Sequence, residues 1–197
     1  MAQIDDGLLI ARAIPIGSQN GFSATLVSNF GSMISEVEEL FGPRNHDYTI
    51  LGVEFSGTIP GIWFPRDCKH IAIQLGKPAM MDFNKAHFQL AHETVHLLDP
   101  VVGGTQNVLE EGLATFYQLR YIHRLDPNYF TGDAKYDAAC MFALRLMAES
   151  PNAIKTLRAQ GQTISALTAQ QLRGAGVGLT NDEANILALP FQGWTPP

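Results

Sequence analysis

The stretch AHETVHLLD, residues 91–99, contains the pattern His-Glu-x-x-His. On an α-helix, residues four positions apart lie on one face, so His92 and His96 can direct their imidazole nitrogens at a single ion. Glu93 lies about a quarter-turn away, where its carboxylate can reach a water on that ion without binding the ion itself. The pattern therefore predicts a helix that carries two metal ligands and a general base.

The residues around the pattern predict that it is helical. Asn84 is the expected N-cap, and Pro100 is expected to end the helix after Asp99. Apolar positions along the helix are supplied by Phe88, Leu90, Ala91, Val95 and Leu98. With six histidines in 197 residues, chance yields the pattern in about one such chain per hundred, so a further ligand is needed to support a metal site.

That ligand is expected in the stretch NVLEEGLAT, residues 107–115. A catalytic zinc ion takes three protein ligands and leaves a fourth position for water. Asn107 and Glu110 have the spacing of a capping box, which gives Glu110 a structural role and leaves Glu111 as the third ligand. Gly112 and Ala114 are small, and we expect them to let this helix approach the His92 helix closely.

Together these residues resemble the gluzincin branch of the zincin metallopeptidases, in which His-Glu-x-x-His on one helix is completed by a glutamate on the next. The stretch LEEGLAT is similar to the family's Asn-Glu-Gly-x-Ala signature, with Glu111 at the ligand position and Glu110 in place of the usual Asn. The resemblance implies Zn²⁺ bound by His92, His96 and Glu111, with Glu93 as the general base. It covers the strand before the pattern, the His92 helix and the Glu111 helix.

The chain departs from this family in two respects. The step of 15 residues from His96 to Glu111 is short, which indicates a minimal catalytic core with a tight loop between the helices. Some relatives have an acid four residues after the ligand glutamate that orients a histidine, and Thr115 occupies that position here. Asp99 is a rival ligand, although three ligands from one helix strain a tetrahedral site. It is otherwise expected to orient a histidine or to cap the turn into Pro100.

Composition sets the bounds on class and location. The chain is 46% hydrophobic and 16% charged, which favours one domain over residues 1–197, with an α/β part over about 1–98 and a helical part over about 105–190. A net charge of −6 without a basic cluster argues against nucleic acid as a partner.

The expected location follows from what the sequence lacks. It contains no apolar run long enough to predict a membrane span, and no secretory signal is evident. Cys68 and Cys140 are expected to be free buried thiols, as in the cytoplasm, and one disulfide between them is the alternative.

The predicted fold is α+β and zincin-like: a small twisted sheet packs on the His92 helix and the Glu111 helix, and a helical C-terminal half follows. In zincins an edge strand lines the cleft and binds an extended peptide, and residues 71–75 are either that edge or an ordinary buried strand. Residues 192–197 are expected to be a loose tail. Expected strands lie at 8–16, 48–55, 61–64 and 70–75, and expected helices at 30–41 (begun near Ser32 or Ser35), 108–124, 133–149, 151–160, 165–173 and 181–189.

The leading functional hypothesis is a zinc-dependent metallopeptidase that hydrolyses amide bonds of a peptide or protein substrate. Such an enzyme also needs a donor for the developing oxyanion. Five candidates stand unranked: Tyr117, Tyr121, His123, Tyr129 and Tyr136. Two alternatives stay open. One is a non-catalytic zinc-binding interaction or regulatory protein on a peptidase-like scaffold, and the other is a helical binding protein in which the pattern arose by chance.

Overall fold

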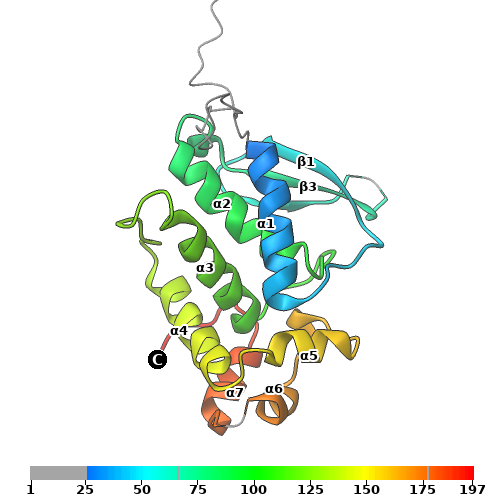
Figure 1. Cartoon of the computed structure of the whole chain (residues 1–197), viewed down its shortest axis with the longest axis vertical. Coiled ribbons are helices and arrows are strands. Elements are labelled where there is room, and N and C mark those ends of the chain that lie inside the picture. Colours follow the sequence, from blue (N-terminus) through cyan, green and yellow to red (C-terminus); the bar gives the residue numbers. More distant parts are fainter. Residues whose placement is uncertain (1–25, 66, 177) are drawn as a thin grey trace, which may run out of the picture.

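The computed structural model describes residues 26–65, 67–176 and 178–197, so the strand predicted at 8–16 lies outside the described residues. The described part has the predicted α+β composition, with a three-stranded sheet followed by a helical C-terminal half (Figure 1). The elements are α1 (Leu26–Phe41), β1 (Thr49–Phe55), β2 (Gly61–Trp63), β3 (His70–Leu75), the 3₁₀ turn η1 (Lys77–Ala79), α2 (Phe83–His96), α3 (Val108–Ile122), α4 (Ala134–Glu149), α5 (Ala153–Ala159), the 3₁₀ turn η2 (Ile164–Ala166), α6 (Ala169–Ala175) and α7 (Asn181–Ala188).

The sheet has the strand order β1-β3-β2. β1 runs parallel to β3, with Thr49 opposite His70, and β2 runs antiparallel to β3, with Ile62 opposite Ile73. Of the two alternatives for residues 71–75, the edge beside the cleft is therefore wrong, because β3 is paired on both sides. It is an ordinary buried strand, with Ile73 and its apolar neighbours fully covered. β2 is the edge strand on the side away from β1.

α2 packs against β3 and β2, and α1 and α3 pack against α2. The helix begins after Asp82, whose side chain accepts a hydrogen bond from the Lys85 backbone N–H, so Asn84 is not the N-cap. It ends at His96, three residues before Asp99, with Leu97 as its C-cap. The predicted boundaries were therefore both placed too late in the chain.

α1 begins earlier than predicted. It starts at Leu26, and Ser32 and Ser35 lie inside it, where the Ser35 hydroxyl donates to the Gly31 carbonyl 3.2 Å away. A serine that bonds the carbonyl four residues before it can lie within a helix, which is why these serines do not mark its start. The five buried residues of α1 are all apolar: Leu26, Phe30, Met33, Val37 and Phe41.

α3 is the central helix, between α2 and α4 (Figure 1). Asn107 caps it by accepting from the Glu110 backbone N–H, as the spacing predicted. Gly112 faces α4, because a Cβ at this position would lie 2.3 Å from the Ala139 carbonyl oxygen. The expectation that Gly112 lets α3 approach α2 is therefore wrong. Consecutive helical residues point in different directions, so Glu111 faces α2 while Gly112 faces α4.

The main buried core contains residues of β3 and of each helix from α1 to α7. A smaller core joins the start of α3 to the end of the chain, where Phe191 and Trp194 pack with Val108 and Ala139. Trp194 is 8% exposed, so the prediction of a loose tail after residue 191 is wrong at this residue. None of the described helices combines the length and the apolar composition needed to cross a lipid bilayer.

Candidate metal centre

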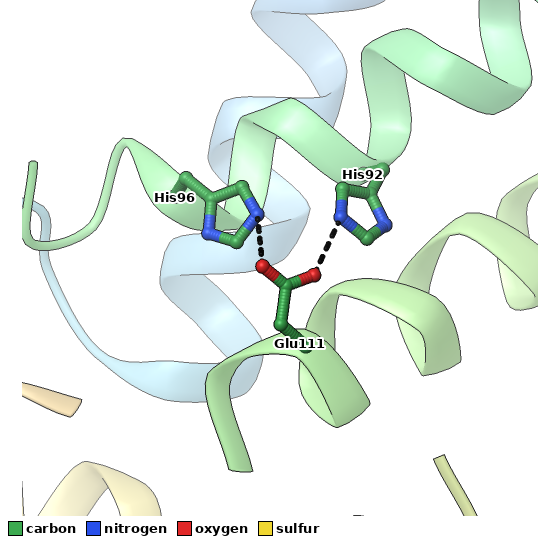
Figure 2. Close-up of side chains that lie close together, drawn as sticks. All are labelled: His92, His96 and Glu111. Atoms are coloured by element: carbon green, nitrogen blue, oxygen red, sulfur yellow. Dashed lines mark hydrogen bonds and ion pairs between the residues drawn. The ribbon is translucent and has the colours of Figure 1, made fainter. Parts of the chain in front are cut away.

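His92, His96 and Glu111 point toward a common point between α2 and α3 (Figure 2). The Nε2 atom of His92 lies 3.1 Å from Oε2 of Glu111, and Nε2 of His96 lies 3.8 Å from Oε1 of the same carboxylate. One potential ligand atom from each residue lies within 4.8 Å of the other two. The structure thus brings together the three residues predicted to bind the metal.

The chemistry of this donor set fits a divalent metal ion. Two imidazole nitrogens and one carboxylate oxygen are a recurring ligand set of catalytic zinc sites. Imidazole also suits other first-row divalent metals, so the donors define a class of ion. His92, His96 and Glu111 all line a cleft, so an ion bound to them would keep a face accessible from that cleft.

The charges of the cluster favour a cation. Burial raises the pKa of the Glu111 carboxyl, but the imidazoles of His96 and His92 outweigh it and hold this pKa below its ordinary value. Burial lowers the pKa of His96, but the carboxylates of Glu111 and Glu110 outweigh it and raise this pKa to about 10. A bound divalent cation would replace the proton that these carboxylates stabilise on His96.

Glu93 is buried beside the cluster, with 4% of its surface exposed, and lines the same cleft. Its pKa is raised, chiefly by burial and further by the negative charges of Glu111 and Glu110, which together outweigh the two imidazoles. A carboxylate with a raised pKa binds a proton more readily than an ordinary one, which suits a group that accepts a proton during a reaction. Glu93 therefore has the electrostatic setting of a general base.

Glu110 has a contact that the sequence interpretation missed. Its backbone N–H is bonded to Asn107, but its carboxylate does not return to the cap. Instead Nδ1 of His96 donates to Oε1 of Glu110 over 2.7 Å, and the Ser165 hydroxyl donates to Oε2. The sequence signal for this contact was the pair of adjacent acids, Glu110 and Glu111, at the start of the helix. The spacing from Asn107 accounts for the hydrogen bond of the Glu110 backbone N–H, but it does not account for the contacts of the Glu110 carboxylate.

Within the part of the chain that the structure describes, Asp99 lies outside the group that could hold a metal ion, and its carboxylate contacts Arg158 instead of a histidine. Its carboxylate accepts from Nε and Nη2 of Arg158, over 2.9 and 3.0 Å, and from the backbone N–H of Ile164 over 3.1 Å. The expectations that Asp99 is a rival ligand or orients a histidine are not supported, because α2 ends at His96 and the residues that follow leave the stripe on which the histidines lie. Asp99 instead connects the end of α2 to the C-terminal half.

The structure separates the five candidate oxyanion donors. Tyr129 and Tyr136 line the cleft, whereas Tyr117, Tyr121 and His123 do not. The Tyr117 hydroxyl lies 3.3 Å from Glu36, and its side chain is fully buried.

Tyr136, on α4, is the candidate that contacts a predicted ligand. Its ring meets that of His92 edge-on, with centroids 5.6 Å apart. Burial, followed by the charges of Glu111 and Glu93, raises its pKa to about 12, so its hydroxyl keeps its proton at neutral pH. A protonated phenol in this position can donate a hydrogen bond into the cleft.

The cleft has a volume of about 820 Å³ and is open to solvent. Ile59 and Ile62, from β2 and the loop before it, line the cleft, as do Phe88 of α2 and Phe130 of the loop before α4. Ile59 and Phe130 are 80% and 76% exposed. A cleft of this size can hold a short stretch of peptide, and large apolar side chains at its rim can cover apolar parts of a substrate.

Comparison with protein-family models, with curated proteins and with solved structures finds no match to this chain. Its function must be argued from the geometry and chemistry of the site.

Proposed function

We propose that this protein is a zinc-dependent metallopeptidase of the gluzincin type, with a zincin-like fold, that hydrolyses amide bonds of a peptide or protein substrate. The observation that carries the proposal is the convergence of His92, His96 and Glu111 in the wall of a cleft, with Glu93 beside them. Structural zinc sites are usually closed by four protein ligands, whereas three ligands facing a cleft are typical of catalytic sites. The open cleft thus favours the enzyme over a non-catalytic zinc protein.

Each residue has a defined role in this reaction. His92, His96 and Glu111 would hold the ion, which would supply an activated water and polarise the substrate carbonyl. Glu93 accepts the proton of the attacking water, which its raised pKa favours. It then returns this proton to the leaving amine. The Tyr136 hydroxyl donates a hydrogen bond to the carbonyl oxygen as negative charge develops there.

We propose that the substrate binds as an extended strand along β2. β2 is paired with β3 on one side, and its residues Gly61 and Ile62 line the cleft. An added strand would use backbone hydrogen bonds that tolerate many side chains. The exposed apolar side chains of Phe130 and Ile59 can be buried against a substrate. They therefore favour peptides with large apolar residues near the scissile bond.

Replacement of Glu93 by Gln tests the proposal. The Glu93→Gln variant should retain zinc but hydrolyse an unstructured protein about 10²- to 10⁴-fold more slowly, because the amide cannot accept the proton. Glu39→Gln, an exposed position on α1, is the matched control and should keep the parent rate. Undiminished hydrolysis by Glu93→Gln would contradict the catalytic assignment. Zinc binding by the parent without turnover of any peptide in a diverse library would favour the non-catalytic zinc protein.

A further inference from the structure

The Glu110 carboxylate is held from two sides. It is 2% exposed, and its oxygens have different partners: His96 Nδ1 donates to Oε1 over 2.7 Å, and the Ser165 hydroxyl donates to Oε2. The backbone of Glu110 is also fixed, because its N–H donates to Asn107 Oδ1 over 2.9 Å. The orientation of this carboxylate is therefore set by the start of α3 and by η2 together.

This arrangement determines how His96 presents its ring. A histidine that donates from Nδ1 to a carboxylate keeps the lone pair of its other nitrogen available for a metal. The Nε2 atom of His96 faces Glu111, 3.8 Å from Oε1. The contact with Glu110 thus selects both the tautomer and the ring orientation that metal binding needs.

The partner of Glu110 comes from the C-terminal half. In η2, the Ile164 N–H donates to Asp99 just after α2, and the Ile164 carbonyl accepts from Asn107 Nδ2, over 2.8 Å, just before α3. These two hydrogen bonds connect η2 to both ends of the loop that joins the metal-binding helices. They place Ser165, the next residue, beside Glu110.

In some gluzincins the acid that orients a histidine lies four residues after the ligand glutamate. Here that residue is Thr115, whose hydroxyl donates to the Glu111 carbonyl over 2.7 Å, within its own helix. Glu110, directly before the ligand, makes the contact with His96 instead. The orienting carboxylate of this chain therefore occupies a different position from the one that the resemblance implies.

We propose that Glu110 is a positioning residue for His96, and that Ser165 holds the Glu110 carboxylate in place, so that the C-terminal half sets part of the affinity of this site for a divalent metal. The inference rests on the metal site of the proposed function but does not require peptidase activity. Its readouts are metal affinity and the ligand geometry around the metal.

The test measures the zinc dissociation constant of the full chain by competition with a chromophoric chelator. Glu110→Ala should weaken zinc binding about 10- to 100-fold, the usual effect of losing a carboxylate that orients a metal ligand. Ser165→Ala, which removes one hydrogen bond to that carboxylate, should weaken it about three- to tenfold. Glu110→Gln should lose less than Glu110→Ala, because an amide can still accept from His96 and donate to the Ser165 oxygen.

Thr115→Ala is the control, since it removes a buried hydroxyl from the same helix without touching a histidine. It should lower the midpoint of urea unfolding in EDTA but leave zinc affinity within twofold of the parent. The absorption spectrum of the cobalt-substituted protein should change in Glu110→Ala and not in Thr115→Ala, because only the former frees the His96 ring. Zinc affinity in Glu110→Ala equal to that of the parent overturns this proposal alone, whereas a parent that binds no divalent metal overturns the proposed function as well.

Discussion

Replacement of Gly112 by alanine probes the packing that places Glu111. A Cβ at residue 112 would lie 2.3 Å from the Ala139 carbonyl oxygen and 2.9 Å from the Ala143 Cβ. Ala139 and Ala143 are fully buried in α4, and a backbone oxygen within a helix cannot rotate aside. To restore ordinary van der Waals contact, α3 and α4 would have to separate by about 1 Å.

Two opposing effects decide the outcome. Alanine in place of glycine inside a helix contributes about 1 kcal/mol of stability through the lower entropy of the unfolded chain. Forcing an extra group into a well-packed interface costs about 1–3 kcal/mol, and the rigid backbone contact at Gly112 favours the upper end. The Gly112→Ala variant should therefore be destabilised by about 1–2 kcal/mol in net terms.

Gly31→Ala is the matched control. Gly31 lies inside α1, is exposed, and has no atom within 4 Å of an added Cβ, so only the favourable effect of about 1 kcal/mol applies. Urea unfolding in EDTA, followed by circular dichroism, compares both variants with the parent. Zinc affinity should also fall in Gly112→Ala, because Glu111 is the preceding residue and moves with it. Equal stabilisation of both variants would refute the close approach of α3 and α4.

Three further predictions concern other parts of the molecule. Arg158→Ala should lower the free energy of unfolding by about 3–5 kcal/mol in urea titrations, because the Asp99 side chain, only 10% exposed, would lose its cationic partner; a loss below 1 kcal/mol, on the order of an exposed pair, would contradict this. Burial lowers the pKa of His87, so the unfolded chain binds the proton more readily. The stability of the parent should thus fall relative to His87→Gln as the pH drops below 6.5, and parallel pH profiles of the two proteins would argue against it. Phe130→Ser should raise KM for apolar peptides about three- to tenfold with kcat nearly unchanged, since its exposed ring lines the cleft; an unchanged KM would remove Phe130 from the substrate site.

The sequence predicted local structure well where the cause is local. The strands at 49–55, 61–63 and 70–75 follow β-prone runs, and the cap at Asn107 follows from its spacing to Glu110. Strand order depends on which distant segments pair, so the central place of β3 was not recognised. Four of the six residues in the run HIAIQL are apolar, three of them consecutive, as expected of a strand covered on both faces, and this signal favours the buried alternative.

The candidate site divides in the same way. His92 and His96 follow from helical periodicity, and Glu111 follows from its position on the next helix. The surrounding contacts could not be predicted, because their partners are distant in sequence. Ser165 lies 55 residues from Glu110, and Arg158 lies 59 residues from Asp99. Such pairs form only when the C-terminal half folds against α2 and α3, and no local pattern encodes that contact.

In the proposed function, α2 and α3 together bind one divalent ion through His92, His96 and Glu111. Elemental analysis of the purified chain, after equilibration with zinc and removal of excess metal, tests it most directly. The parent should hold one zinc per chain, and His92→Ala and Glu111→Ala should each hold almost none while remaining folded by circular dichroism. A parent without stoichiometric zinc, or folded variants that retain it, would contradict the claim.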